Sequence, residues 1–198
     1  MKFVHRVLAA AALLFACSSR ADLIYQIDID TSSLAGNGYM ELSLAGLADA
    51  PGAIATVTSS STFGAVVDQF GSVSGDLTGT LQLASELGMA DLLQQVNLGS
   101  LLSMQVQLGG DWLTALADAS ITFAIKLWSE DWLPLLTGDG AGDLLRMELL
   151  PGGTVSIETF SPLVTVQPVI SVPTPAAALL LVCGLLAIGV CQRRSRGR

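Results

Sequence analysis

Short runs of alternating apolar and polar residues, separated by turn-forming residues, fill the middle of the chain. Residues 120–128 form the clearest run, because Ile121, Phe123, Ile125 and Leu127 occupy every second position. Successive side chains of a strand point to opposite faces, so this pattern indicates a half-buried strand. Comparable runs lie at residues 23–29, 39–44, 53–58, 65–70, 77–83, 104–108, 144–149 and 154–160. About nine short strands at this spacing predict a mostly β fold, an antiparallel β-sandwich of the jelly-roll type, over residues 22–160.

Residues 85–102 interrupt the alternation. Glu86, Asp91, Gln94 and Gln95 are poor strand formers, whereas the leucines among them suit burial. We expect a short helix or a partly buried loop in this segment.

Charged residues are unevenly distributed along the chain. Between Asp22 and Val172 the only basic residues are Lys126 and Arg146, whereas all 17 Asp and Glu residues fall there, which gives a net charge of −15. A domain this anionic repels phosphate backbones, and this excludes nucleic-acid binding. The same acidity suits a secreted or surface protein.

The central segment contains neither cysteine nor histidine. The cysteines are Cys17, Cys183 and Cys191, and the single histidine is His5. A disulfide framework, a cysteine nucleophile, a Ser-His-Asp triad and a histidine-ligated metal site are therefore all excluded from the central domain. We expect a protein that is not an enzyme.

The N-terminus, residues 1–21, has the three parts of a secretory signal peptide. Basic residues precede an apolar run at residues 7–16, and the small residues Ser19 and Ala21 follow it. A run of about ten residues is too short to span a bilayer as a helix. We expect export by the general secretion machinery and cleavage by signal peptidase after Ala21, so that the mature protein begins at Asp22.

Lipidation is an alternative fate for this N-terminus. Residues 14–17 read Leu-Phe-Ala-Cys and resemble a bacterial lipobox, which would place the lipid on Cys17. Phe15 is bulky for that motif, so cleavage after Ala21 is the expectation.

The C-terminus begins with a linker and a proline motif. Residues 161–171 are rich in Pro, Val and Thr, which predicts an extended linker. The motif that follows consists of Val172, Pro173, Thr174 and Pro175. Its prolines keep it from joining a helix interior.

An apolar run and a basic tail complete the C-terminus. Residues 176–191 would form about 24 Å of helix, which makes a single transmembrane helix where the bilayer thins locally. Residues 192–198 contain the cluster Arg193, Arg194, Arg196 and Arg198. By the positive-inside rule this cluster stays in the cytoplasm, so the domain lies outside the inner membrane.

This order of motif, short helix and basic tail resembles the PEP-CTERM sorting signal. Thr174 stands where that family usually has Glu between the prolines. The resemblance implies a substrate of an exosortase, a membrane peptidase of Gram-negative bacteria that produce exopolysaccharide. It also implies transient anchoring in the inner membrane, removal of the tail from about Pro175 onward and a final place at the cell surface or outside the cell. The alternative is a permanent single-span anchor.

Parts of the central segment resemble an uncharacterised family of PEP-CTERM proteins. Residues 22–36 with Tyr39, and residues 133–137, 144–146 and 153–162, carry the resemblance. Where that family usually has an Asn-Pro-Gly turn, this chain has Ala-Pro-Gly at residues 50–52. The resemblance implies no catalytic residues.

Paired carboxylates are the one catalytic constellation left to consider. Glu130 and Asp131 lie beside Trp128 and Trp132, which is compatible with a glycosidase-like acid pair. Adjacent residues on a strand point to opposite faces, so a solvated acidic loop is the expectation here.

Calcium is a candidate cofactor. Asp139 and Asp143 flank Gly140-Ala-Gly142, and Asp28 and Asp30 are two residues apart, so each pair offers oxygen ligands. Neither pair matches an EF-hand, and Asp-Gly spacing is also ordinary turn chemistry.

Tryptophans are the candidate ligand-binding residues. Trp112, Trp128 and Trp132 can form a platform for sugar rings, although large aromatic residues more often belong to a core. Two functions therefore remain: a non-enzymatic surface or matrix protein associated with exopolysaccharide, and a carbohydrate-binding module. Exposure of Trp112, Trp128 or Trp132 on one concave face favours the module, and burial of all three favours the matrix protein.

Overall fold

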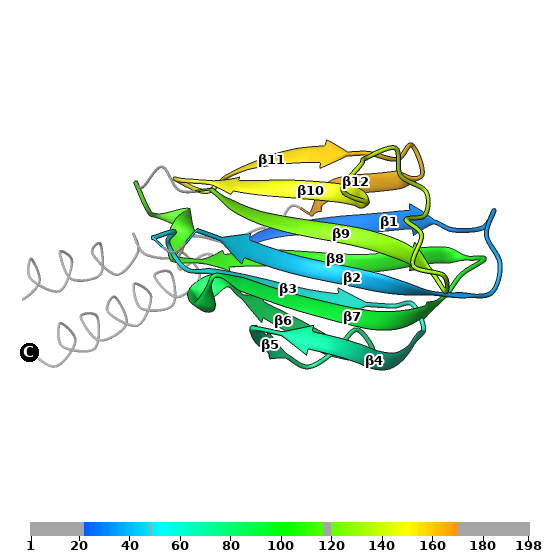
Figure 1. Ribbon diagram of the computed structural model, residues 1–198. Helices are drawn as coiled ribbons and strands as arrows, with labels where there is room; N and C mark the ends of the chain where they lie inside the picture. The colour runs from blue at the N-terminus through cyan, green and yellow to red at the C-terminus, as the bar shows by residue number, and fades with distance from the viewer. Residues whose placement is uncertain (1–21, 48, 117–119, 170–198) are drawn as a thin grey trace, which may run out of the picture. The chain divides into compact units, whose positions relative to one another are not determined.

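The alternating runs of the sequence form two antiparallel β-sheets that pack face to face (Figure 1). The computed structural model describes residues 22–47, 49–116 and 120–169. Sheet A has the strand order β12-β1-β8-β3-β6-β5, and sheet B has the order β11-β10-β9-β2-β7-β4. The strands of sheet A are β1 (Leu23–Asp30), β3 (Ala53–Ser59), β5 (Ser72–Ser74), β6 (Thr80–Ala84), β8 (Leu101–Gly110) and β12 (Val164–Val169). Those of sheet B are β2 (Asn37–Gly46), β4 (Phe63–Phe70), β7 (Met89–Asn97), β9 (Ile121–Ser129), β10 (Asp143–Leu150) and β11 (Thr154–Thr159).

The hydrophobic core lies between the two sheets. In β2, Met40, Leu42 and Leu44 are fully buried, whereas Tyr39 and Glu41 lie on the outer face of sheet B. The other central strands alternate in the same way, so inward side chains of both sheets meet in one layer. The expected mostly β sandwich is confirmed.

The segment expected to be a helix or loop is mainly strand. Residues 85–102 contain the short 3₁₀ helix η1 (Ser85–Leu87), then β7 and the start of β8. Gln94 lies fully buried in β7 because both ends of its amide have partners. Its Oε1 accepts a 2.9 Å hydrogen bond from the Leu77 N–H, and its Nε2 donates one of 2.9 Å to the Gly64 carbonyl. These contacts remove the desolvation cost that makes glutamine a poor core residue.

The domain extends beyond the boundary expected at residue 160. Strand β12 occupies most of the expected linker 161–171 and pairs with β1, from Ile24 opposite Val169 to Ile29 opposite Val164. Pro168 is tolerated because β12 is an edge strand, where one row of N–H groups needs no partner. The compact unit is therefore Asp22–Val169.

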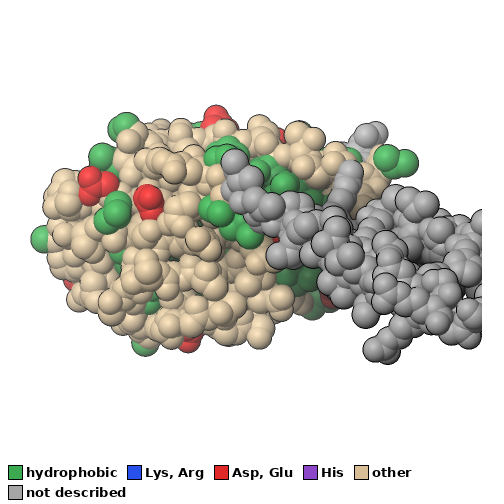
Figure 2. Space-filling view, turned by 180° about the vertical axis from the view of Figure 1, so that it is seen from behind, with side chains coloured by type: hydrophobic (Ala, Val, Ile, Leu, Met, Phe, Trp, Pro, Cys, Tyr) green, Lys and Arg blue, Asp and Glu red, His purple; other side chains and the backbone are tan. Residues whose placement is uncertain are grey.

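The outer face of sheet A is polar and carries few charges. Strand pairing places Gln26, Gln105, Thr58 and Thr80 in one row across four strands. The Oδ1 of Asp28, on the same face, accepts a 3.0 Å hydrogen bond from Gln26 Nε2. Figure 2, turned by 180° from Figure 1, shows this side of the molecule as mostly uncharged.

Both ends of the described chain lie at one end of the sandwich, called here the terminal end (Figure 1). Ile24 in the first strand pairs with Val169 in the last. The register continues through the sheets, so β2 ends and β7 begins there, with Ala45 opposite Met89. The opposite end carries the loop at residues 130–142, which follows β9.

Among the residues that the structure describes, no helix is long and apolar enough to cross a membrane. The expected transmembrane helix at residues 176–191 lies outside them, as do the expected signal peptide at residues 1–21, the motif at residues 172–175 and the basic tail.

Candidate functional site

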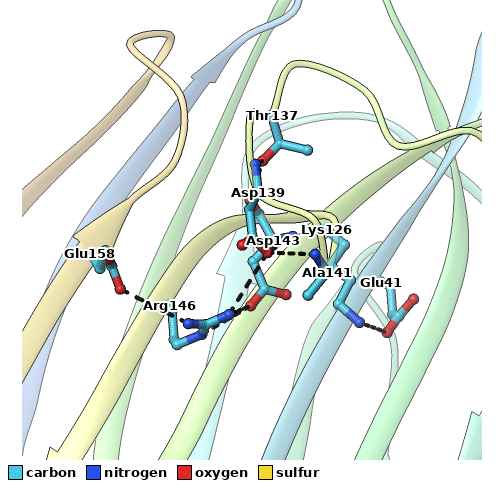
Figure 3. Close-up of polar contacts among 8 residues, drawn as sticks. All are labelled: Glu41, Lys126, Thr137, Asp139, Ala141, Asp143, Arg146 and Glu158. Carbon is cyan, nitrogen blue, oxygen red and sulfur yellow. Dashed lines mark hydrogen bonds and ion pairs between the residues drawn. The ribbon is translucent and has the colours of Figure 1, made fainter.

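Both basic side chains of the described domain lie on the outer face of sheet B. Lys126 on β9 is opposite Glu41 on β2, and Arg146 on β10 is opposite Glu158 on β11. Their carboxylate partners also belong to this face or to the loop beside it (Figure 3). This face is therefore the one place where the anionic domain balances charge locally.

Glu41 connects the lysine to an aromatic side chain. Its Oε1 lies 3.0 Å from Lys126 Nζ, and its Oε2 accepts a 2.8 Å hydrogen bond from Trp128 Nε1. Lys126 also lies 5.9 Å from the centroid of the Trp128 ring. The side chains of Lys126 and Glu41 are only 23% and 19% exposed, so partial desolvation strengthens these contacts. Together they fix the orientation of the Trp128 indole.

Trp132 and Tyr39 form a stacked pair next to Trp128. Their ring centroids are 4.7 Å apart and their planes differ by 8°. Trp132 is 53% exposed, so the stack buries one face of its ring and leaves much of the rest to solvent. An exposed, fixed aromatic ring is the kind of surface on which a sugar ring packs.

The loop after β9 holds Trp132 in a strained backbone conformation. Its φ is 62°, in the left-handed region that non-glycine residues rarely adopt. Ser129 stabilises the loop through two hydrogen bonds. Its carbonyl accepts one of 3.0 Å from the Trp132 N–H, and its Oγ accepts one of 3.1 Å from the Leu133 N–H. A bridge between Trp128 and Pro134 closes the loop against the strand. Strain of this kind persists only where surrounding contacts impose it.

The structure separates the three candidate tryptophans. Trp112 lies in the 3₁₀ helix η2 (Asp111–Leu113) at the terminal end, where it is 1% exposed and donates from Nε1 to the Gly109 carbonyl at 2.9 Å. It is a core residue and cannot contact a ligand. Trp128 and Trp132 lie together at the opposite end, and Tyr39, which was not among the candidate ligand-binding residues, completes their cluster.

The acidic pair Glu130 and Asp131 lies in the same loop. Both residues are exposed, and the Asp131 N–H donates to Ser129 Oγ at 3.2 Å. These two residues lie in a turn and not on a strand, and both carboxyl groups face solvent beside Trp132. This arrangement matches the expected solvated loop.

Asp139 and Asp143 have partners other than a metal (Figure 3). Asp139 Oδ2 accepts hydrogen bonds from the Ala141 N–H at 3.0 Å and from the Asp143 N–H at 3.2 Å. Asp143 Oδ2 accepts from Arg146 Nε at 3.0 Å and also from its Nη2. The hydrogen bond from Arg146 to Asp143 raises the pKa of the guanidinium further above its ordinary value. These hydrogen bonds close the turn that contains Asp139 and Asp143. The positive charge beside the carboxylate of Asp143 is the guanidinium of Arg146.

The second pair of calcium candidates is also engaged. Asp28 Oδ1 accepts hydrogen bonds from Gln26 and from Ser103 Oγ, and Asp30 Oδ1 accepts from the Ser32 N–H at 2.9 Å. In the described ranges, no group of three or more His, Cys, Asp or Glu side chains is placed to hold a metal ion.

Asp91 is a member of the sheet B face that the sequence did not reveal. It lies on β7 opposite Ser43, and Ser43 is the next outward-facing residue of β2 after Glu41. Burial raises its pKa to about 6, and the negative charge of Glu41 adds to the shift, while Lys126 opposes it. Its Oδ2 is buried without a hydrogen-bond partner among the described residues. No sequence signal indicated this, because the segment around Asp91 was expected to be a helix or loop.

Comparison with known proteins identified no relative of this chain. No protein-family model, curated protein or solved structure matches this chain. The residues themselves therefore carry the functional assignment.

Proposed function

We propose that the chain is an exported, non-enzymatic protein of the cell surface or extracellular matrix, sorted by an exosortase and associated with exopolysaccharide. The observation that carries the proposal is the spacing at the C-terminus. Strand β12 ends at Val169, and the motif that resembles a sorting signal begins at Val172. A folded domain is thus followed almost directly by the motif, the apolar run and the basic tail, with a signal peptide at the other end of the sequence.

Mass spectrometry of the extracellular fraction tests this proposal. Peptides should end near Pro175, and peptides from residues 176–193 should be absent. Pro173→Ala/Pro175→Ala should leave a full-length, membrane-bound form, whereas Pro162→Ala, outside the motif, should leave processing unchanged. Abundant peptides from residues 176–193 in the extracellular fraction would show a permanent anchor instead.

A second candidate function is carbohydrate binding through the exposed tryptophan. The stacked pair of Trp132 and Tyr39 favours it, because a ring that is 53% exposed is held rigidly by its loop. The acidity of the domain points to neutral polysaccharides, since an anionic polymer would be repelled. The alternative is therefore a carbohydrate-binding module whose platform is Trp132, Tyr39 and the edge of Trp128.

Affinity electrophoresis in gels that contain neutral polysaccharides separates the two functions. Trp132→Ala should abolish any retardation of the protein, whereas Leu133→Ala, at a neighbouring position that is 63% exposed, should not. Equal migration of the wild type with and without every neutral polysaccharide would end the carbohydrate-binding alternative and leave the matrix protein.

We also propose that strands β1–β4 and β6–β8 form most of a jelly roll. Sheet A contains the order β1-β8-β3-β6, and sheet B contains β2-β7-β4, the interleaved order in which a jelly roll distributes its strands. The short strand β5 departs from this pattern, because it pairs with β6 in sheet A and not with β4 in sheet B. Strands β9, β10 and β11 then extend sheet B beside β2, and β12 extends sheet A beside β1.

A further inference from the structure

Exposed apolar side chains gather at the terminal end of the sandwich. Leu116 is 95% exposed, Leu87 is 77% exposed and Leu47 is 70% exposed. They come from three separate segments: the turn after η2, the helix η1 and the loop after β2. Phe70, Met89 and Val169 are exposed at the same end. Figure 2 shows a group of apolar side chains beside this end of the molecule and single ones scattered over the rest of the visible face. Large exposed apolar residues on one end of a domain mark an interaction surface.

The length of the chain beyond the described domain brings this end close to a membrane. Six residues, 170–175, separate Val169 from the apolar run at residues 176–191. Six residues span at most about 20 Å when fully extended. Where that run crosses the bilayer, the terminal end lies at most about 20 Å from the hydrocarbon. The headgroup region is only about 5–8 Å deep on each side, so the connection is long enough for the terminal end to reach it and too short for the domain to move far from it.

The charges at this end favour an apolar contact over an electrostatic one. Neither described basic residue, Lys126 or Arg146, lies there, and the exposed acidic residues Asp49, Glu86 and Asp111 do. Anionic lipid headgroups would repel these carboxylates. Leucine side chains at a loop tip instead insert into the boundary between headgroups and acyl chains.

We infer that the terminal end of the sandwich docks on the outer leaflet of the inner membrane and inserts Leu47, Leu87 and Leu116 into it. This inference rests on the proposed function, because residues 176–191 must first hold the chain at that membrane. Docked in this way, the sandwich stands with the terminal end down and with Trp132 and Tyr39 pointing away from the bilayer. The motif at residues 172–175 then lies in the headgroup layer, where a membrane peptidase acts.

Lipid quenching of a fluorophore tests this orientation in the full chain. Cys17, Cys183 and Cys191 are replaced by Ser, and one new cysteine is introduced and labelled with an environment-sensitive dye. Leu87→Cys places the dye at the terminal end, and Leu133→Cys places it at the opposite end on a residue of similar exposure, 77% against 63%. Each protein is inserted into phosphatidylcholine vesicles whose acyl chains are brominated. Emission from Leu87→Cys should fall by roughly half or more, as expected for a side chain within the interface, and emission from Leu133→Cys should not change.

The outcomes separate this inference from the proposed function. Extraction of the chain from the vesicles at alkaline pH would overturn the anchoring and the docking together. A chain that resists extraction but shows no quenching at Leu87→Cys would overturn the docking alone. A blue shift at Leu87→Cys without quenching would mean that a second copy of the chain covers this end, and would also overturn it. Adding Leu47→Ser and Leu116→Ser to the Leu87→Cys protein should reduce the quenching, whereas adding Leu101→Ser, at an exposed position of the opposite end, should not.

Discussion

Trp132 stacks on Tyr39 with the ring centroids 4.7 Å apart, although the backbone of Trp132 has a φ of 62°. The two facts belong together, because a left-handed backbone turns the side chain back over β2, where Tyr39 lies. The strained backbone of the loop thus places a rigid, half-exposed aromatic surface on the protein.

Glycine should relieve this strain. Trp132→Ala and Trp132→Gly both lose the stack, but glycine adopts positive φ without a steric cost. Trp132→Gly should therefore be about 1 kcal/mol more stable than Trp132→Ala in urea denaturation. The matched control is Leu133, whose φ is not positive: there Leu133→Gly should be less stable than Leu133→Ala. The same order at both positions would argue against strain at Trp132.

Asp91 should make the stability of the domain depend on pH. Its pKa is raised from 3.8 to about 6 in the folded state, so the folded protein binds this proton more tightly than the unfolded chain does. The resulting stabilisation is complete below pH 3.8 and is lost as the pH rises through about 6. Asp91→Asn should therefore be more stable than the wild type at pH 7.5, by on the order of 1 kcal/mol after allowance for solvent screening.

Denaturation of the wild type and Asp91→Asn at pH 4 and pH 7.5 measures this effect. The difference between the two proteins should grow with pH. Glu41→Gln should shrink the difference, because it removes a neighbouring negative charge that raises the pKa of Asp91. Asp68→Asn should have a smaller effect, since the charge of Asp68 contributes less. A difference that does not change with pH would contradict the raised pKa.

Regular alternation made much of the fold predictable. Strand β9 was expected at residues 120–128 and lies at Ile121–Ser129, since its inward side chains repeat every second residue. Strand β7 was missed because its polar residue Gln94 is satisfied by Leu77 and Gly64, which are distant in sequence. Strand β12 was missed because proline and threonine suggest a linker, and only the pairing with β1 shows that it is an edge strand.

The candidate site was predictable only in part. Trp132 and Trp128 were identified by residue type, but the same criterion selected Trp112, which the turn at η2 buries. Tyr39 and Asp91 belong to the site through strand register, which places β2 between β7 and β9. The pairing of β2 with β7 and with β9 joins residues that are far apart in the sequence, and the local alternation that predicts each strand does not predict which strands become neighbours.

The side chain of Thr31 should stabilise the domain, because it links the loop after β1 to the loop before β8. It is fully buried; its Oγ1 donates to the Ser100 carbonyl at 2.6 Å and accepts from the Gly99 and Ser100 N–H groups at 3.2 Å each. Thr31→Val keeps the shape but removes these hydrogen bonds, so it should cost about 2 kcal/mol of unfolding free energy. Ser33→Ala, at an exposed position of the same loop, should cost almost nothing. Equal costs in thermal denaturation would contradict this role.

Calcium should not stabilise the domain specifically. The carboxylates of Asp139 and Asp143 are already bound by Arg146 and by backbone N–H groups. Salt of any kind should raise the melting temperature, because it screens the repulsion within a segment of net charge −15. Millimolar Ca²⁺ and Mg²⁺ should therefore raise it equally. A larger shift with Ca²⁺, lost in Asp139→Asn, would reveal a site that the described contacts do not form.

Truncation should locate the end of the folded domain at Val169. Val164 is 7% exposed and Val166 packs against the core, so β12 covers one edge of sheet A beside β1. A protein of residues 22–169 should melt cooperatively and at the temperature of the chain that retains residues 170–175. A protein of residues 22–160 lacks β12 and leaves the backbone of β1 unpaired along one side, which favours association between copies. It should melt at a lower temperature and elute as larger species in size-exclusion chromatography. If the proteins of residues 22–160 and 22–169 melted at the same temperature, residues 161–171 would be the linker that the sequence suggested. The pairing of Val169 with Ile24 would then contribute nothing to the fold.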